Sequence, residues 1–125
     1  MNQTGRPVSP HVAVFAFPVT AISSITGRLT GVAMSVGAAG LGSMELLGGS
    51  GTALAFMESL GSSGFLLSSG AKFCVGFPIV YHYGVAIRHI IWDFYPDLLE
   101  NEKNEKSSYA LFGGATLISL GLMFA

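Results

Sequence analysis

The sequence predicts an all-α membrane protein with three transmembrane helices in a single domain covering residues 1–125. Half of the 125 residues are hydrophobic and only 10% are charged, whereas a soluble domain carries about 25% charged residues. The chain also contains 17 glycines, and glycine is more frequent in membrane helices than in soluble ones. Three long apolar stretches supply the spans, because a bilayer core of about 30 Å needs about 20 mostly apolar helical residues.

The three stretches follow an N-terminal segment of residues 1–20. The first helix is expected at about residues 21–47, the second at about 65–92 and the third at about 107–125. The first two carry charges only towards their ends, and the third carries none. The N-terminal segment contains three prolines and no continuous apolar core, so it predicts neither a signal peptide nor an arginine-rich presequence.

The connections between the spans are marked by composition. The sequences LGGSGT and SLGSSG break helices and separate the first span from the second. A short interfacial helical turn is expected between them at residues 53–58. The charged sequence DLLENEKNEK, between the second and third spans, predicts a solvated loop or helix end rather than a binding site.

Lysine and arginine predict the orientation, because these residues accumulate on the cytoplasmic side of a membrane. With three spans, the N-terminus and the second loop share one side, and the other side receives only Lys72. The shared side receives the remaining cations, Arg6, Arg28, Arg88, Lys103 and Lys106. The N-terminus is therefore expected in the cytoplasm, or in the matrix of a mitochondrion.

Several function classes are disfavoured by composition. A net charge of −1 provides no basic surface for nucleic acid. Cys74 is the only cysteine, so neither an internal disulfide nor a cysteine metal cage is expected. A transporter would place carboxylates along a path through the membrane, yet Glu45 and Glu58 lie at or outside the edges of the predicted spans.

Ionisable residues inside the second span are functional candidates, because charged groups within a membrane usually face a cavity, a cofactor or a partner helix. His82 lies several turns inside this span. It either bonds to a neighbouring helix or serves as an axial ligand of haem iron. His89 follows seven residues later, about 10 Å further along the same face. His89 or Arg88 is then placed to meet a haem propionate, although a snorkelling arginine explains Arg88 equally well.

The first span offers a second candidate group. Ser24 and Arg28 are four residues apart and share a helical face. A hydroxyl beside a guanidinium near the membrane surface suits the polar head of a quinone, whose tail lies in lipid. The alternative is an interfacial arginine among small residues. The sequence also leaves open whether Ser23 or Ser24 supplies the hydroxyl.

Three motifs resemble a known family. These are RPVSPH at residues 6–11, SITGRLTG at residues 24–31 and HYGVAIRHIIWD at residues 82–93. They resemble motifs of the cytochrome b large membrane-anchor subunit of succinate dehydrogenase, respiratory complex II, in its mitochondrial type. The resemblance covers nearly the whole chain, and the third motif is the most specific.

The resemblance implies that the three helices form half of a heterodimeric haem-binding helix bundle. His82 matches the axial ligand of haem b, and the second axial histidine would come from a small cytochrome b anchor subunit. Ser24 and Arg28 match the serine and arginine of the quinone site. Arg88 and His89 match the pattern that follows the ligand, where we expect a propionate or second-shell role.

The resemblance also implies partners and a location. An iron–sulfur subunit and a flavoprotein subunit would pass electrons from succinate to ubiquinone in the mitochondrial inner membrane, with the N-terminus of this chain on the matrix side. A bacterial inner membrane is the less favoured location. The chain would not catalyse a reaction alone.

At Gly27 this chain departs from the family pattern, which has a histidine there, and Tyr95 is a second departure, where the pattern has a small residue. The first departure removes an imidazole from the quinone pocket. The quinone pocket should therefore be larger or wetter. This departure raises the hypothesis of a quinol-fumarate reductase that works in reverse with a low-potential quinol such as rhodoquinol, the reduced form of rhodoquinone. A haem-less structural anchor is a further alternative, and the presence of His82 disfavours it.

Overall fold

The computed structural model describes residues 5, 14 and 16–124, so the motif at residues 6–11 lies outside the described residues. The described residues form helices and no strand. In chain order the elements are α1 (Val19–Gly48), α2 (Thr52–Gly61), α3 (Phe65–Phe94), the short 3₁₀ helix η2 (Pro96–Leu99) and α4 (Asn101–Met123).

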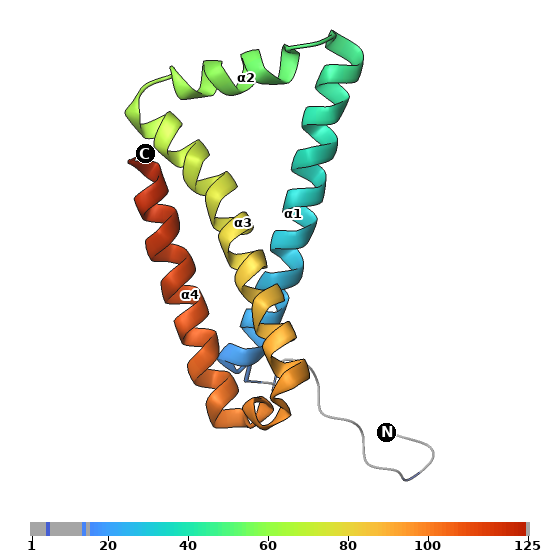
Figure 1. The fold of residues 1–125 in the computed structure, drawn as a ribbon, viewed down its shortest axis with the longest axis vertical. Coiled ribbons are helices and arrows are strands. Elements are labelled where there is room, and N and C mark those ends of the chain that lie inside the picture. Colours follow the sequence, from blue (N-terminus) through green and yellow to red (C-terminus); the bar gives the residue numbers. More distant parts are fainter. Residues whose placement is uncertain (1–4, 6–13, 15, 125) are drawn as a thin grey trace.

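Figure 1 shows how the helices are arranged. The beginning of α1 lies beside the end of α3, and the two helices diverge towards α2, which bridges them at the far end. Helix α4 returns along α3, so α3 contacts both other long helices. The polar residues singled out in the sequence lie at the end where α1 and α3 converge.

Helix α2 closes the far end of the molecule and is longer than the predicted turn at residues 53–58. Glu45, near the end of α1, accepts hydrogen bonds from the backbone amides of Gly51 at 2.9 Å and Ala53 at 3.1 Å. A carboxylate is favourable at this position, because the first amides of a helix lack backbone partners. Gly49 and Gly51 have φ values of 88° and 90°, which glycine adopts readily.

The third long helix begins at Asn101, earlier than the expected start at about residue 107. The charged sequence, for which a solvated loop or helix end was expected, forms the 3₁₀ helix and the first turns of α4, in agreement with the second alternative. Glu102 lies in the first turn, where a negative charge favours the helix. Lys106 approaches its carboxylate at 2.6 Å, and this spacing of four residues supports an exposed helix.

Two of the described helices, α1 and α3, are long and apolar enough to cross a membrane. Each has 30 residues, or about 45 Å of helix, which exceeds a hydrocarbon core of about 30 Å. Helix α4 has 23 residues, and its first turns are charged. The third span therefore stays a prediction.

Small and hydroxyl side chains fill the interfaces between the helices, as expected for membrane helices that pack by close approach. The buried residues of the three long helices are Ser23, Gly27, Thr30, Ser69, Gly76, Tyr81, Ser108, Ala115 and Ser119. Many large apolar side chains face outward instead, including Leu29, Val36, Ile87 and Leu117. This distribution suits a chain whose outer surface meets lipid and neighbouring membrane helices.

Candidate functional site

A pocket of about 320 Å³ lies between the converging parts of α1 and α3. We call it the His82 pocket. Its wall consists of Ser24, Gly27 and Arg28 from α1 together with His82, Val85, Ala86 and His89 from α3. The structure therefore brings together four of the five predicted site residues, because each helix presents residues spaced by three, four or seven positions on one face.

Among residues 5, 14 and 16–124, one polar contact holds the imidazole of His82. Its Nδ1 lies 3.0 Å from the backbone carbonyl oxygen of Gly27. A carbonyl oxygen can only accept a hydrogen bond, so Nδ1 must carry the proton. In the neutral ring, Nε2 then keeps its lone pair and is available as an acceptor or a metal ligand. A hydrogen bond from the second ring nitrogen is what orients a ligating histidine.

Glycine makes this approach possible. A Cβ atom on Gly31 would lie 2.8 Å from Cε1 and 3.2 Å from Nδ1 of His82, so a side chain there would displace the ring. A Cβ atom on Gly27 would lie 3.2 Å and 3.3 Å from the two methyl carbons of Val85. The two glycines are four residues apart on the face of α1 that meets α3, and they allow the backbones to come close.

The other polar groups of the His82 pocket have free hydrogen-bonding capacity. Arg28 and His89 are exposed, and within the described part of the chain neither side chain makes a hydrogen bond or an ion pair. The hydroxyl of Ser24 is likewise without a hydrogen-bond partner among the described residues. A guanidinium, a hydroxyl and an imidazole thus line one pocket with their donors and acceptors available to a ligand.

The adjacent residue Ser23 has a different position. Its Oγ accepts a hydrogen bond from Tyr81 at 3.0 Å and another from Arg88 at 3.0 Å, and the side chain is fully buried. The sequence left open whether Ser23 or Ser24 contributes the pocket hydroxyl. The structure places Ser24 in the pocket wall and Ser23 at the contact with α3.

Arg88 does not line the His82 pocket. Its guanidinium donates from one terminal nitrogen to Ser23 on α1 and from the other to Ser108 on α4, each at 3.0 Å. It also lies over the ring of Trp92, 4.7 Å from the centroid, in a favourable cation–π arrangement. The predicted propionate role of Arg88 stays a prediction, and its observed contacts connect three helices.

Tyr81 completes what we call the Arg88 cluster: Ser23, Tyr81, Arg88 and Ser108. The tyrosine is fully buried, and its ring lies 5.0 Å from that of Phe112 and 5.5 Å from that of Phe77. Sequence reasoning did not single out Tyr81 or Ser108. The available signal was the spacing of seven residues between Tyr81 and Arg88, which places them on one face of α3, away from the face of His82 and His89.

Within the described residues, His82 is not part of a cluster that could hold a metal ion. Among residues 5, 14 and 16–124, no three His, Cys, Asp or Glu side chains gather where they could hold a metal. A metal bound at Nε2 of His82 would therefore need its remaining ligands from a cofactor or from another chain. This donor arrangement suits an iron that already has a macrocyclic ligand.

Comparisons with known proteins identify the family to which the chain belongs. The family model of the succinate dehydrogenase/fumarate reductase transmembrane subunit matches residues 2–122. The chain is 32% identical to the mitochondrial succinate dehydrogenase cytochrome b560 subunit of Dictyostelium discoideum, over 91% of this chain and 59% of that protein. It is 34% identical to the Bos taurus cytochrome b560 subunit, over 94% of this chain and 69% of that protein.

A bacterial relative aligns over most of both chains. The succinate dehydrogenase cytochrome b556 subunit of Paracoccus denitrificans is 32% identical, over 96% of this chain and 91% of that protein. In contrast, the chain spans less than two thirds of the length of the Dictyostelium relative.

The two neighbouring serines provide a matched test of the Arg88 cluster. Ser23→Ala removes the acceptor shared by Tyr81 and Arg88, and it should lower the free energy of unfolding by about 1–2 kcal/mol. Ser24→Ala removes a hydroxyl that lies in the pocket wall without a partner, so it should change stability by less than about 0.5 kcal/mol. Denaturant titration in detergent micelles measures both, and equal effects would contradict the proposed difference.

Proposed function

The chain belongs to the family of transmembrane subunits of succinate dehydrogenase and fumarate reductase, and on that premise we propose that it is the large cytochrome b anchor of a succinate:quinone oxidoreductase. In this proposal it binds haem b together with a small cytochrome b anchor subunit and forms part of a ubiquinone site. The flavoprotein and iron–sulfur subunits dock on the side of the membrane where α1 begins. The location is the mitochondrial inner membrane, with that side facing the matrix.

The observation that carries the haem assignment is the hydrogen bond from Nδ1 of His82 to the carbonyl oxygen of Gly27. In the neutral imidazole this hydrogen bond leaves Nε2 with its lone pair, which a ligand of haem iron requires. Because Gly31 has no side chain, the imidazole of His82 can occupy the space next to α1. The residues present therefore fit a role in which His82 would hold the haem iron, and a partner anchor subunit would supply another ligand.

Haem b would supply a one-electron redox centre between the anchor subunits. The role of this chain is to hold the imidazole in a fixed tautomer and orientation. His89 lies on the same wall of the pocket and is proposed to meet a propionate, to which a ring N–H can donate a hydrogen bond. Arg88 supports the site from outside the pocket wall, because its contacts with Ser23 and Ser108 hold α1 and α4 against α3.

The quinone assignment depends on Arg28 and Ser24. Their side chains line the His82 pocket and have no partners among the described residues. A guanidinium and a hydroxyl that are already in place can donate hydrogen bonds to a quinone oxygen as negative charge develops there, and donors positioned in this way stabilise a reduction step. Because the chain holds only part of this site, the partner subunits would complete it.

The haem assignment is tested with the complex purified in detergent. The dithionite-reduced minus oxidised spectrum should show a b-type haem that is stoichiometric with the flavin. His82→Ala should remove most of this signal, because the iron loses an axial ligand, whereas His89→Ala should retain the haem with a shifted midpoint potential. A wild-type complex that oxidises succinate but contains no haem would contradict the assignment and leave the role of a structural anchor.

The quinone assignment predicts a selective loss of activity. Arg28→Leu should lower kcat/KM for quinone reduction by about 100-fold, which is typical for removal of a positioned donor. Succinate oxidation with a soluble dye that accepts electrons before the membrane should be unchanged, because Arg28 is remote from the flavin subunit's reaction. Arg28→Lys keeps the charge but loses the planar fork of donors, so an intermediate loss is expected. Equal losses with dye and quinone would indicate misassembly instead.

The glycine at position 27 allows a test of quinone preference. Gly27→His adds an imidazole to the pocket wall, and we expect the ratio of succinate oxidation to fumarate reduction and the preference between ubiquinone and rhodoquinone to shift by several-fold. Gly27→Ala is the matched control, because it adds the same Cβ atom at 3.2 Å from Val85 without the imidazole. If both variants keep the wild-type ratio and preference, the hypothesis that Gly27 adapts the pocket to a low-potential quinol is wrong.

A further inference from the structure

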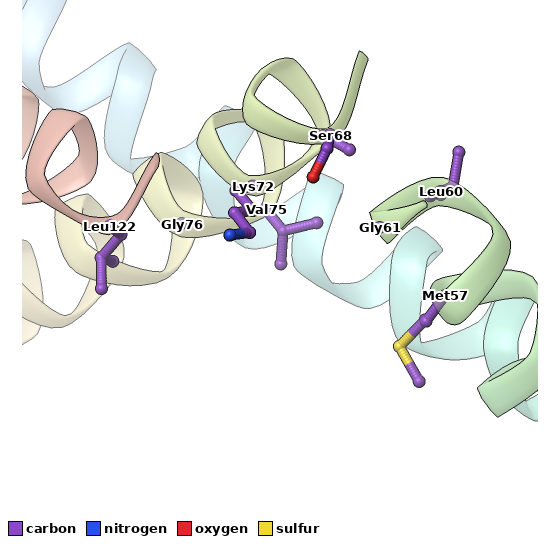
Figure 2. Close-up of a pocket in the computed structure, with 9 residues that line it drawn as sticks. Met57, Leu60, Gly61, Ser68, Lys72, Val75, Gly76 and Leu122 are labelled. Carbon is purple, nitrogen blue, oxygen red and sulfur yellow. The ribbon is translucent and has the colours of Figure 1, made fainter. Parts of the chain in front are cut away.

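A second feature lies towards the other end of the molecule, where α2, α3 and the end of α4 form an apolar groove of about 450 Å³ (Figure 2). Met57 and Leu60 contribute from α2, Val75 and Gly76 from α3, and Leu122 from α4. The groove is open along its length, and its volume is within the range of about 300–1,000 Å³ that is usual for small-molecule sites. Apolar walls of this kind suit an extended hydrocarbon chain.

Two polar side chains line this groove. Lys72 and Ser68 are four residues apart on α3 and therefore share a face. Within the described part of the chain, the ammonium of Lys72 has no ion pair or hydrogen bond, and the hydroxyl of Ser68 has no hydrogen-bond partner. Lys72 is also the only lysine or arginine between Arg28 and Arg88. The groove thus combines an unpaired cation with an apolar channel.

The depth of Lys72 in the membrane indicates which part of a lipid its ammonium can contact. Helix α3 has 30 residues, about 45 Å, so about 7 Å of helix extends beyond each side of a 30 Å hydrocarbon core when the helix is centred. Lys72 lies seven residues after Phe65, about 10 Å from the start of the helix. Its backbone is therefore only about 3 Å inside the hydrocarbon, and a lysine side chain can reach the level of the lipid phosphates.

We propose that this groove binds a phospholipid with an anionic head group. The Lys72 ammonium and the Ser68 hydroxyl donate to the phosphate, and an acyl chain lies against Val75, Gly76 and Leu122. The charge of Lys72 favours this occupant over a quinone head, which is neutral, and over an apolar helix, which would bury the cation unpaired. The site is independent of haem and quinone binding, so its failure would leave the proposed function untouched.

The test measures lipid bound to the assembled complex. The complex is delipidated in detergent and titrated with dioleoyl phosphatidylglycerol or with dioleoyl phosphatidylcholine, and the bound phospholipid is counted by native mass spectrometry. We expect phosphatidylglycerol to bind more tightly than phosphatidylcholine. Lys72→Gln should weaken phosphatidylglycerol binding by about fivefold, which is the usual effect of one basic residue at an anionic surface. Lys72→Arg should bind like the wild type.

Two control variants separate this site from general effects. Lys103→Gln removes the same charge from an exposed lysine that pairs with Glu100, and it should leave lipid binding unchanged. Ala71→Phe places a ring in the groove and should reduce the binding of both lipids, whereas Leu66→Phe changes a side chain that is 86% exposed and outside the groove, so it should have no effect.

Four results would overturn the proposal. The first is a Lys72→Gln complex that binds phosphatidylglycerol as tightly as the wild type. The second is equal binding of the two lipids by the wild type. The third is displacement of the bound lipid by ubiquinone at equal concentration, which would assign the groove to a quinone. The fourth is a wild-type complex that binds no phospholipid in the titration, which would mean that a partner helix covers the groove.

Discussion

The close approach of α1 to α3 at Gly27 is the constraint on which the candidate site depends. Membrane helices associate through tight packing of small residues, because lipid provides little hydrophobic driving force between them. Here the absence of side chains at Gly27 and Gly31 lets a backbone carbonyl reach the imidazole of His82 at 3.0 Å. That single contact satisfies Nδ1 and leaves Nε2 free, and it also brings Ser24 and Arg28 to the same pocket. The close approach of α1 to α3 therefore determines both how the two helices pack and which polar groups face the pocket.

The Arg88 cluster stabilises this approach from the side facing α4. A guanidinium inside a bundle costs free energy unless its donors are used, and two of the nitrogens of Arg88 donate to hydroxyls on two different helices. Its Nε is buried without a hydrogen-bond partner among the described residues, so one N–H donor of the guanidinium has no acceptor there. The residue connects α1, α3 and α4, while the adjacent His89 faces the pocket.

The helical class and most of the His82 pocket could be predicted from the sequence. The family resemblance, which depended on three motifs, and the all-helical membrane fold, which composition and hydropathy predicted, are confirmed. Spacing predicted which residues of one helix share a face, as for Ser24 with Arg28 and His82 with His89. Spacing along one helix cannot predict which of its faces packs against which neighbouring helix. Arg88 was therefore considered as a partner of a haem propionate, although in the structure its guanidinium contacts α4 and does not line the His82 pocket. The early start of α4 was missed because the charges that indicate a loop also pair along a helix.

Gly27 has two functions in the structure, and they can be separated. Its carbonyl oxygen fixes the tautomer of His82, and its missing side chain leaves room beside Val85. Every residue type provides a backbone carbonyl, so another residue at position 27 could still contact His82 where α1 and α3 stay equally close. The close approach itself and the space in the pocket wall depend on the missing side chain, because a Cβ atom there would lie 3.2 Å from Val85. A side chain at position 27 should therefore change the part of the pocket beside Arg28 and Ser24, where a quinone is proposed to bind, and alter the contact with His82 only as far as it moves α1 away from α3.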